Sequence, residues 1–329
     1  MNPLPRLFIT CAALIAPAAA YEVFSALPYI PPDAAKKIRL WQEIANRSEG
    51  LSLNDSDTQA KERNTAATWK ATVAQFKKAK NNGMAAIPRT HWNYGSVTRK
   101  GTLEERLETI FKQKDKLNAH IRWVMLYGSQ PGEDRSKEAY SYTPQDIKRA
   151  KDWLRAHEKK GHPPVKLCWN VRNNSKAEHD MCLDPNVDVI LIEGSPEKWY
   201  GNNGRRQEFL KWVTTDPKTR NKPLVFQVPF NQAPEKEDLY YELRKFVHWL
   251  ASDRIMGGDF LRRDDVIFLP ITYNPRPDFY PETDAGGEKY QNTLAGAALS
   301  LIEQRETFEG RASRKATDEF LRDRTRTDR

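Results

Sequence analysis

The chain has 329 residues, of which 39% are hydrophobic and 29% are charged. This length and composition indicate a globular protein with one large domain or two ordinary ones, and they exclude a membrane-embedded chain. The formal net charge is +9, but the basic residues are spread over predicted helix surfaces rather than blocked together. We therefore expect attraction to anionic surfaces or polymers, and no nucleic-acid partner.

Residues 1–20 have the form of a secretory signal peptide. Arg6 precedes an apolar run that ends in Ala18-Ala19-Ala20, which fits a cleavage site between small residues. The run is short for a transmembrane helix, although an uncleaved anchor is an alternative. We predict that the mature protein begins near Tyr21, is secreted or periplasmic, and has no stable membrane insertion after cleavage.

From residue 21 onward, short apolar segments alternate with longer amphipathic ones. The apolar segments predict strands at 22–27, 50–53, 84–89, 121–127, 165–171, 187–193, 224–228 and 266–273. The amphipathic segments predict helices at 32–47, 57–82, 102–117, 143–160, 205–214, 235–252 and 288–303, with a short helix at 175–181. Pro144 stands in the first turn of the helix predicted at 143–160, a favoured position for proline, and Gly161 follows its end.

Strands that alternate with helices predict a parallel sheet with helical crossovers. Eight such units over ~250 residues are typical of a (β/α)8 barrel. An open doubly wound sheet is the alternative, but that fold usually carries a glycine-rich nucleotide fingerprint, and the sequence has none. We expect one α/β domain, a (β/α)8 barrel, over residues 21–310, followed by a charged tail at 311–329.

The cysteines suggest a disulfide if the chain is exported. Cys11 lies in the signal segment, which leaves Cys168 and Cys182, fourteen positions apart. An oxidising compartment permits a bridge between them, and two buried free thiols are the alternative. No cysteine stands at a spacing typical of a metal site, so we expect no metal and no cofactor.

In a barrel, the residues at the carboxyl ends of the strands meet on one face. Here those positions are rich in aromatic and amide side chains, which suit a polyhydroxylated ligand such as a sugar, either neutral or anionic. The predicted substrate-binding residues are His91, Trp92, Tyr127, Trp169, Asn170, Trp199, Gln227, Tyr273 and Asn274. The sequence carries no signal for an oligomeric state.

Glu193 is the strongest candidate for a catalytic group. It directly follows the apolar run Val189–Ile192, and no other predicted strand ends in a carboxylate. At that position it could act as an acid/base or a nucleophile in glycosidic cleavage; alternatively, it could form an ion pair with Arg172. A second carboxylate is needed ~5–10 Å away. The candidates are Asp278, Glu282 and Asp284 after the last predicted strand, and Glu133 and Asp134 after the fourth.

Two other functions remain open at this point. A barrel with a binding cleft and no acid pair would bind carbohydrate without cleaving it. A phosphodiesterase could use His91, which follows the third predicted strand, as an acid/base. Nucleophilic serine chemistry is not indicated, because no G-x-S-x-G motif occurs.

The pattern with Trp169-Asn170 near the end of one strand and Glu193 at the end of the next resembles the TIM-barrel glycoside hydrolases. The resemblance covers most of residues 21–305 and rests on architecture. Two departures are visible: Val171 stands where one large clan has a glutamate after the asparagine, and the DxxDxDxE run of chitinase-like barrels is absent. The resemblance implies an exported glycoside hydrolase that cleaves a polysaccharide or an oligosaccharide.

Overall fold

A computed structural model describes fifteen stretches of the chain. They are residues 21–26, 47–52, 85–86, 89–91, 103–105, 107–108, 111–112, 120–127, 142–171, 175–194, 204–229, 239–252, 260–263, 265–271 and 297–307. The predicted signal segment, the tail at 311–329 and the long helix predicted at 57–82 lie outside these stretches.

The described strands form one parallel sheet. They are β1 (Glu22–Ala26), β2 (Gly50–Ser52), β3 (Ala85–Ala86), β4 (Arg89–His91), β5 (His120–Ile121), β6 (Trp123–Tyr127), β7 (Lys166–Val171), β8 (Val189–Glu193), β9 (Leu224–Pro229) and β10 (Val266–Ile271). Their order across the sheet is β4-β6-β7-β8-β9-β10-β1-β2-β3-β5, and every pairing is parallel. Each predicted apolar segment contains or adjoins an observed strand, so the α/β class with a parallel sheet is confirmed.

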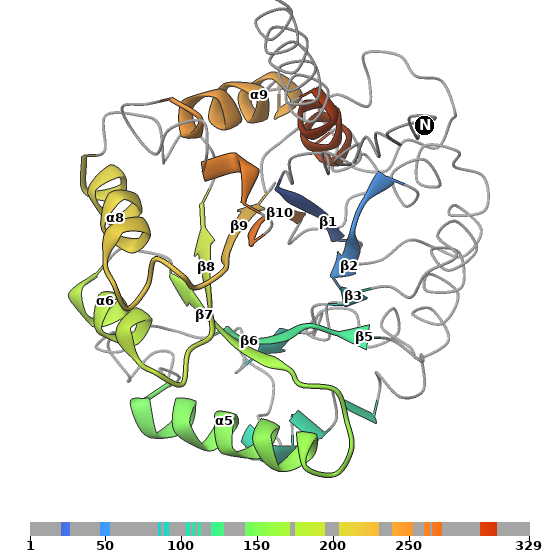
Figure 1. The fold of residues 1–329 in the computed structure, drawn as a ribbon, viewed down its shortest axis with the longest axis vertical. Coiled ribbons are helices and arrows are strands. Elements are labelled where there is room, and N and C mark those ends of the chain that lie inside the picture. Colours follow the sequence, from blue (N-terminus) through green and yellow to red (C-terminus); the bar gives the residue numbers. More distant parts are fainter. Residues whose placement is uncertain are drawn as a thin grey trace, which may run out of the picture.

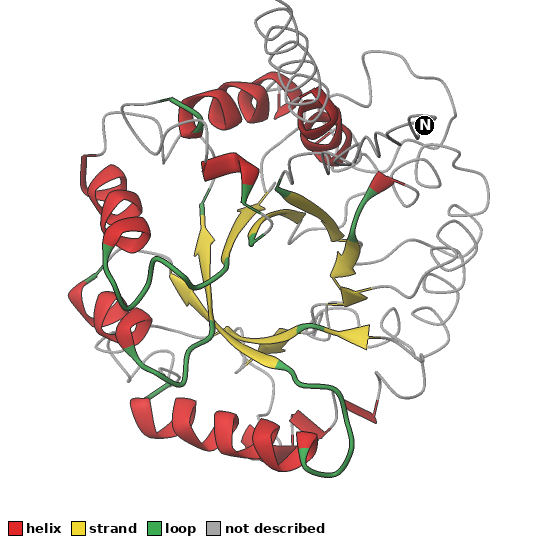
Figure 2. Cartoon of the chain, in the orientation of Figure 1, coloured by secondary structure: helices red, strands yellow, loops and turns green. Residues whose placement is uncertain are grey.

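The sheet curls around a central axis, and the described helices lie outside it (Figures 1 and 2). These helices are α5 (Pro144–Glu158), α6 (Lys176–Leu183), α8 (Gly204–Thr215) and α9 (Leu239–Leu250), and a 3-10 turn, η1, covers Phe260–Arg262. Residues 297–307 are also helical.

Local sequence signals explain where helix α5 begins and ends. The Thr143 side chain accepts a hydrogen bond from Asp146 N, and the Asp146 carboxylate accepts one from Thr143 N, so the first turn is capped reciprocally. Pro144 occupies the first turn, where its missing N–H is not needed. Gly161, with a φ of 90°, then turns the chain away after the helix ends.

Alternation along the strands divides the buried residues into two cores. The inner core, enclosed by the curled sheet, consists of Phe24, Trp123, Met125, Cys168, Val189, Leu191, Val225, Ile267 and Leu269. The outer core lies between the sheet and the helices, and it combines intervening strand residues such as Ile190 and Phe226 with helix residues such as Ile147 and Phe246. A sheet that curls around its own side chains places the ends of its strands around a common centre.

The two cysteines of the described chain are free thiols, so the predicted disulfide is wrong. Cys168 belongs to the inner core, whereas Cys182 lies on α6 in the outer core. The two side chains therefore belong to different cores, separated by strand β7, and they are not bonded. Burial raises the pKa of both thiols, which keeps them protonated and unreactive.

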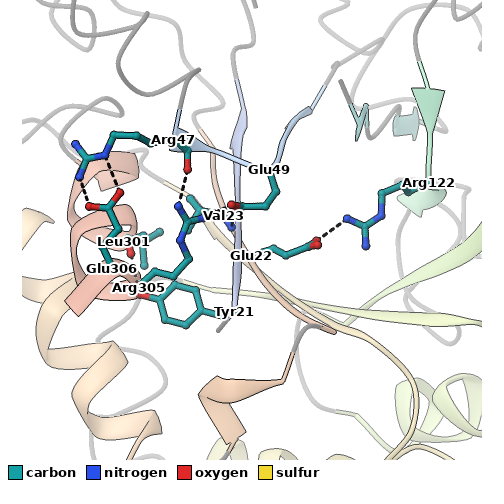
Figure 3. A network of polar contacts seen from close by, with 9 residues as sticks. All are labelled: Tyr21, Glu22, Val23, Arg47, Glu49, Arg122, Leu301, Arg305 and Glu306. Carbon is teal, nitrogen blue, oxygen red and sulfur yellow. Dashed lines mark hydrogen bonds and ion pairs between the residues drawn. The ribbon is translucent and has the colours of Figure 1, made fainter. Parts of the chain in front are cut away.

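A polar network joins the start of the sheet to the helix at 297–307 (Figure 3). The Arg305 guanidinium forms an ion pair with Glu49 and donates to the Arg47 carbonyl at 2.6 Å. The second carboxylate oxygen of Glu49 accepts the backbone N–H of Val23 at 2.8 Å. Arg305 is only 7% exposed, and through Glu49 its side chain ties the last described helix to strand β1.

Replacing Arg305 with methionine should destabilise the fold by about 2–3 kcal/mol. Breaking a fully buried pair costs about 3–5 kcal/mol, and Glu49 is partly hydrated. Glu306→Gln is the matched control, because it removes the more exposed ion pair with Arg47 and should cost less than about 1 kcal/mol. Urea unfolding measures both; equal losses would contradict the special role of Arg305.

Candidate functional site

Asn170, Glu193 and Gln227 come from adjacent strands β7, β8 and β9. Each stands two positions after a residue of the inner core, and the period of two places all three on the inner face of the sheet. Those inner-core residues are Cys168, Leu191 and Val225. Since the strands are parallel, the three polar side chains lie toward the carboxyl edge of the sheet.

The Glu193 side chain is bonded to Asn170 on one side, and its backbone is paired with Gln227 on the other. Asn170 Nδ2 donates a hydrogen bond to Glu193 Oε2 at 2.9 Å, across 23 positions of sequence. On the other side, Glu193 is paired in register with Gln227, and Gly194 N donates to the Gln227 carbonyl at 3.2 Å. The sequence suggested Arg172 as an alternative partner of Glu193, and that residue lies outside the described stretches.

These three side chains are buried, although all three are polar. Glu193 is 8% exposed, Asn170 is 4% exposed and Gln227 is fully buried. The Asn170 Oδ1 atom has no hydrogen-bond partner in the part of the chain that the structure describes. A buried carboxylate beside amide groups can accept hydrogen bonds from ligand hydroxyls, and it can serve as a proton donor, a proton acceptor or a nucleophile.

Trp169 does not belong to this group, so its predicted role in stacking against a ligand is wrong. Its indole lies in the outer core with the residues of the helices and is 2% exposed. Consecutive residues of a strand point to opposite faces, so Trp169 and Asn170 cannot both reach the inner face. The same alternation, applied to the sequence, would have shown that Trp169 and Asn170 cannot both belong to the site.

Other predicted site residues are placed only in part. His91 ends β4 and Tyr127 ends β6, and the two are register partners at the same edge of the sheet; only their backbones are described. The remaining ones lie outside the described stretches: Trp92, Trp199, Tyr273, Asn274, Asp278 and Glu282.

Asp188 directly precedes strand β8, at the end opposite Glu193. It forms an ion pair with Lys151 of α5 and accepts the backbone N–H of Leu167 at 2.7 Å. These contacts connect a helix, a strand and the residue before β8. We infer a structural role for Asp188 and a separate role for Glu193, although both acids flank the same apolar run.

Histidines elsewhere in the described stretches do not join the carboxyl edge. His157 stacks on Trp153 and His162 at ring distances of 4.7 and 4.0 Å, on and just after the outer helix α5. His179 stacks on Trp212 in the outer layer, where burial lowers its pKa. Within the described residues, no group of three or more histidine, cysteine or acidic side chains could hold a metal ion.

None of the described helices is long and apolar enough to cross a membrane.

Taken together, the fold and the site define an α/β protein with a curled parallel sheet and a buried carboxylate–amide cluster at the carboxyl edge of its strands. That placement is where parallel α/β proteins build their binding and catalytic sites.

Among solved structures, similar folds occur in glycoside hydrolases. Active domain 2 of a thermostable chitinase from Pyrococcus furiosus, in complex with chito-oligosaccharides, matches with a TM-score of 0.50 and 12% identity, over 89% of this chain and 98% of that one. A family 30 subfamily 8 xylanase from Clostridium acetobutylicum matches with a TM-score of 0.48 and 14% identity, over 85% of this chain and 71% of the xylanase. A family GH18 chitinase from Chromobacterium violaceum matches with a TM-score of 0.45 and 10% identity, over 86% of this chain and 83% of the chitinase.

No family model and no curated protein sequence matches the chain. At 12% identity, the match to the Pyrococcus furiosus domain concerns the fold alone. The chain therefore resembles TIM-barrel glycoside hydrolases in architecture, without assignment to a specific family.

Proposed function

We propose that this chain is an exported (β/α)8 barrel that acts on carbohydrate, as a glycoside hydrolase of polysaccharides or oligosaccharides. The observation that carries the proposal is the buried Asn170–Glu193 pair at the carboxyl edge of adjacent strands. A buried carboxylate held by a neutral donor is suited to acid/base or nucleophilic attack on a glycosidic bond.

The strand pairings support a closed barrel. Two residues separate β3 from β4, and Arg122 alone separates β5 from β6; β3 pairs with β5 as β4 pairs with β6. If β3 and β4 count as one interrupted strand, and β5 and β6 as another, the sheet has eight parallel strands, each bonded to two neighbours. That arrangement is a closed ring, and the carboxyl ends of all eight strands would line one face of the barrel.

In this proposal Glu193 is the acid/base or the nucleophile, and Asp278 or Glu282 supplies the second carboxylate. The separation of the two carboxylates would set the outcome: about 5 Å for retention and about 6.5–9.5 Å for inversion. His91, Trp92, Tyr127, Asn170, Trp199, Gln227, Tyr273 and Asn274 would contact the sugar. The chitinase domain that shares this fold was crystallised with chito-oligosaccharides, which makes amino-sugar polymers one substrate class to test.

A polysaccharide panel tests the proposal. The mature chain, starting at Tyr21, is incubated with soluble cellulose derivatives, xylan, chitosan and polygalacturonate, and the release of reducing ends is measured. We expect at least one polymer to be cleaved. Retention on a polymer in affinity electrophoresis without release of reducing ends would instead indicate a non-catalytic binding barrel. The absence of both retention and release on every polymer would contradict a carbohydrate function.

A further inference from the structure

The Asn170 side chain divides its hydrogen-bonding capacity between two directions. Its Nδ2 atom donates to Glu193 at 2.9 Å, and its Oδ1 atom has no partner among the described residues although Asn170 is only 4% exposed. Buried polar atoms in folded proteins nearly always have a partner, contributed by the protein, by water or by a ligand. No described residue donates to the Oδ1 atom, and a bound ligand can supply that donor.

The orientation of this amide follows from the chemistry of its neighbour. An ionised carboxylate offers only acceptors, so the NH2 end of Asn170 must face Glu193. A reversed amide would bring Oδ1 against a carboxylate oxygen, which repels it. The unpartnered Oδ1 is thus a consequence of holding Glu193.

We propose that Asn170 is a positioning residue that fixes the Glu193 carboxylate with its Nδ2 atom and, with Oδ1, accepts a hydrogen bond from a hydroxyl of a neutral sugar bound beside Glu193. This inference rests on the proposed glycoside hydrolase function. It narrows the substrate class to neutral sugars. The net charge of the whole chain, taken alone, would also allow anionic polymers.

The electrostatics of the cluster explain the preference for a neutral sugar. Glu193 Oε2 and Asn170 Oδ1 are both acceptors, and the neighbouring Gln227 is fully buried on the same face. A hydroxyl group can donate to either acceptor. A uronate carboxylate cannot donate, and it would add a second negative charge beside a buried one.

The first test replaces Asn170 with aspartate, which keeps the size of the side chain. At pH 7 the introduced carboxylate cannot donate to Glu193, and kcat/KM on the cleaved polymer should fall about 10- to 100-fold, the loss expected for one hydrogen bond to a charged group. As the pH falls, the introduced carboxyl gains a proton and can donate again, so the deficit relative to wild type should shrink.

The matched control is Trp169→Phe, which changes the preceding residue on the opposite face of the same strand. It should leave both kcat/KM and its pH dependence unchanged after correction for the folded fraction. A deficit of Asn170→Asp that stays constant between pH 4.5 and 7.5 would indicate a merely structural role for Asn170. No deficit would overturn the positioning role outright.

The second test measures binding by calorimetry to the wild-type chain, which keeps the Glu193 carboxylate, at low temperature with cellohexaose, xylohexaose, chitohexaose and hexagalacturonate, and chromatography of the ligands afterwards confirms that they stay intact. At least one neutral or N-acetylated oligosaccharide should bind ten times more tightly than hexagalacturonate. Tighter binding of hexagalacturonate would overturn the inference while leaving the hydrolase proposal intact. If no polymer is cleaved and no oligosaccharide binds, the proposed function and this inference fail together.

Discussion

Replacing Glu193 with glutamine is expected to lower kcat/KM on the cleaved polymer by roughly 10²–10⁴-fold, the usual contribution of a positioned acid/base. The substitution keeps the shape of the side chain and leaves an oxygen to accept the Asn170 hydrogen bond. The free energy of unfolding should therefore change by less than about 1 kcal/mol. Reducing-end assays and urea unfolding of the same preparation measure the two quantities.

Asp188→Asn provides a control within the same strand. Asp188 is held by Lys151 and by the N–H of Leu167, so this change should cost about 1–2 kcal/mol of stability and leave kcat/KM of the folded fraction unaltered. Glu193→Gln should therefore lower the activity and Asp188→Asn the stability, although the two acids flank the same apolar run. Unchanged activity in Glu193→Gln would remove Glu193 from the mechanism.

Phe226→Ala is expected to cost about 3–5 kcal/mol of stability, which is typical of removing a buried aromatic side chain. Phe226 is 1% exposed. Its ring stacks on Phe268 at 5.3 Å and meets Phe246 edge-on at 5.9 Å, so it joins two strands to helix α9. Since single domains are stable by only about 5–15 kcal/mol, a large share of the folded population should be lost on mild heating.

Phe226→Leu retains most of the buried volume and should cost about 1.5 kcal/mol. Guanidinium unfolding with a common m-value compares the two variants with wild type. If leucine costs as much as alanine, the loss would come from the aromatic contacts of the ring and not from the buried volume. Gln227 follows Phe226 directly and faces the inner side, so the alanine variant also tests whether the site depends on this outer packing.

The sequence predicted the strands well because their signal is local. Each buried strand is a short β-prone run bounded by turn residues, and β8 shows this most clearly, with Val189–Glu193 buried at every position. Helix α5 was equally readable, since its capping residues stand beside it in the chain. The prediction of Glu193 as the end of a strand needed nothing beyond this local pattern.

The errors concern the side of the sheet that a residue faces. Trp169 and Asn170 are neighbours in sequence, and both were assigned to the site, but alternation sends Trp169 outward. The same reason separates Cys168 from Cys182. A one-residue difference in register exchanges the two faces of a strand, and composition alone does not report it.

The amino-acid sequence by itself determined the alternation of strands and helices, the limits of helix α5, and the position of one acid at the end of a buried strand, because these depend on interactions between near neighbours. Only the tertiary structure decided which side chains meet. The Asn170–Glu193 hydrogen bond spans 23 positions and the Arg305–Glu49 ion pair spans 256. Such contacts depend on strand pairing and packing across the whole sheet, which the local pattern does not specify.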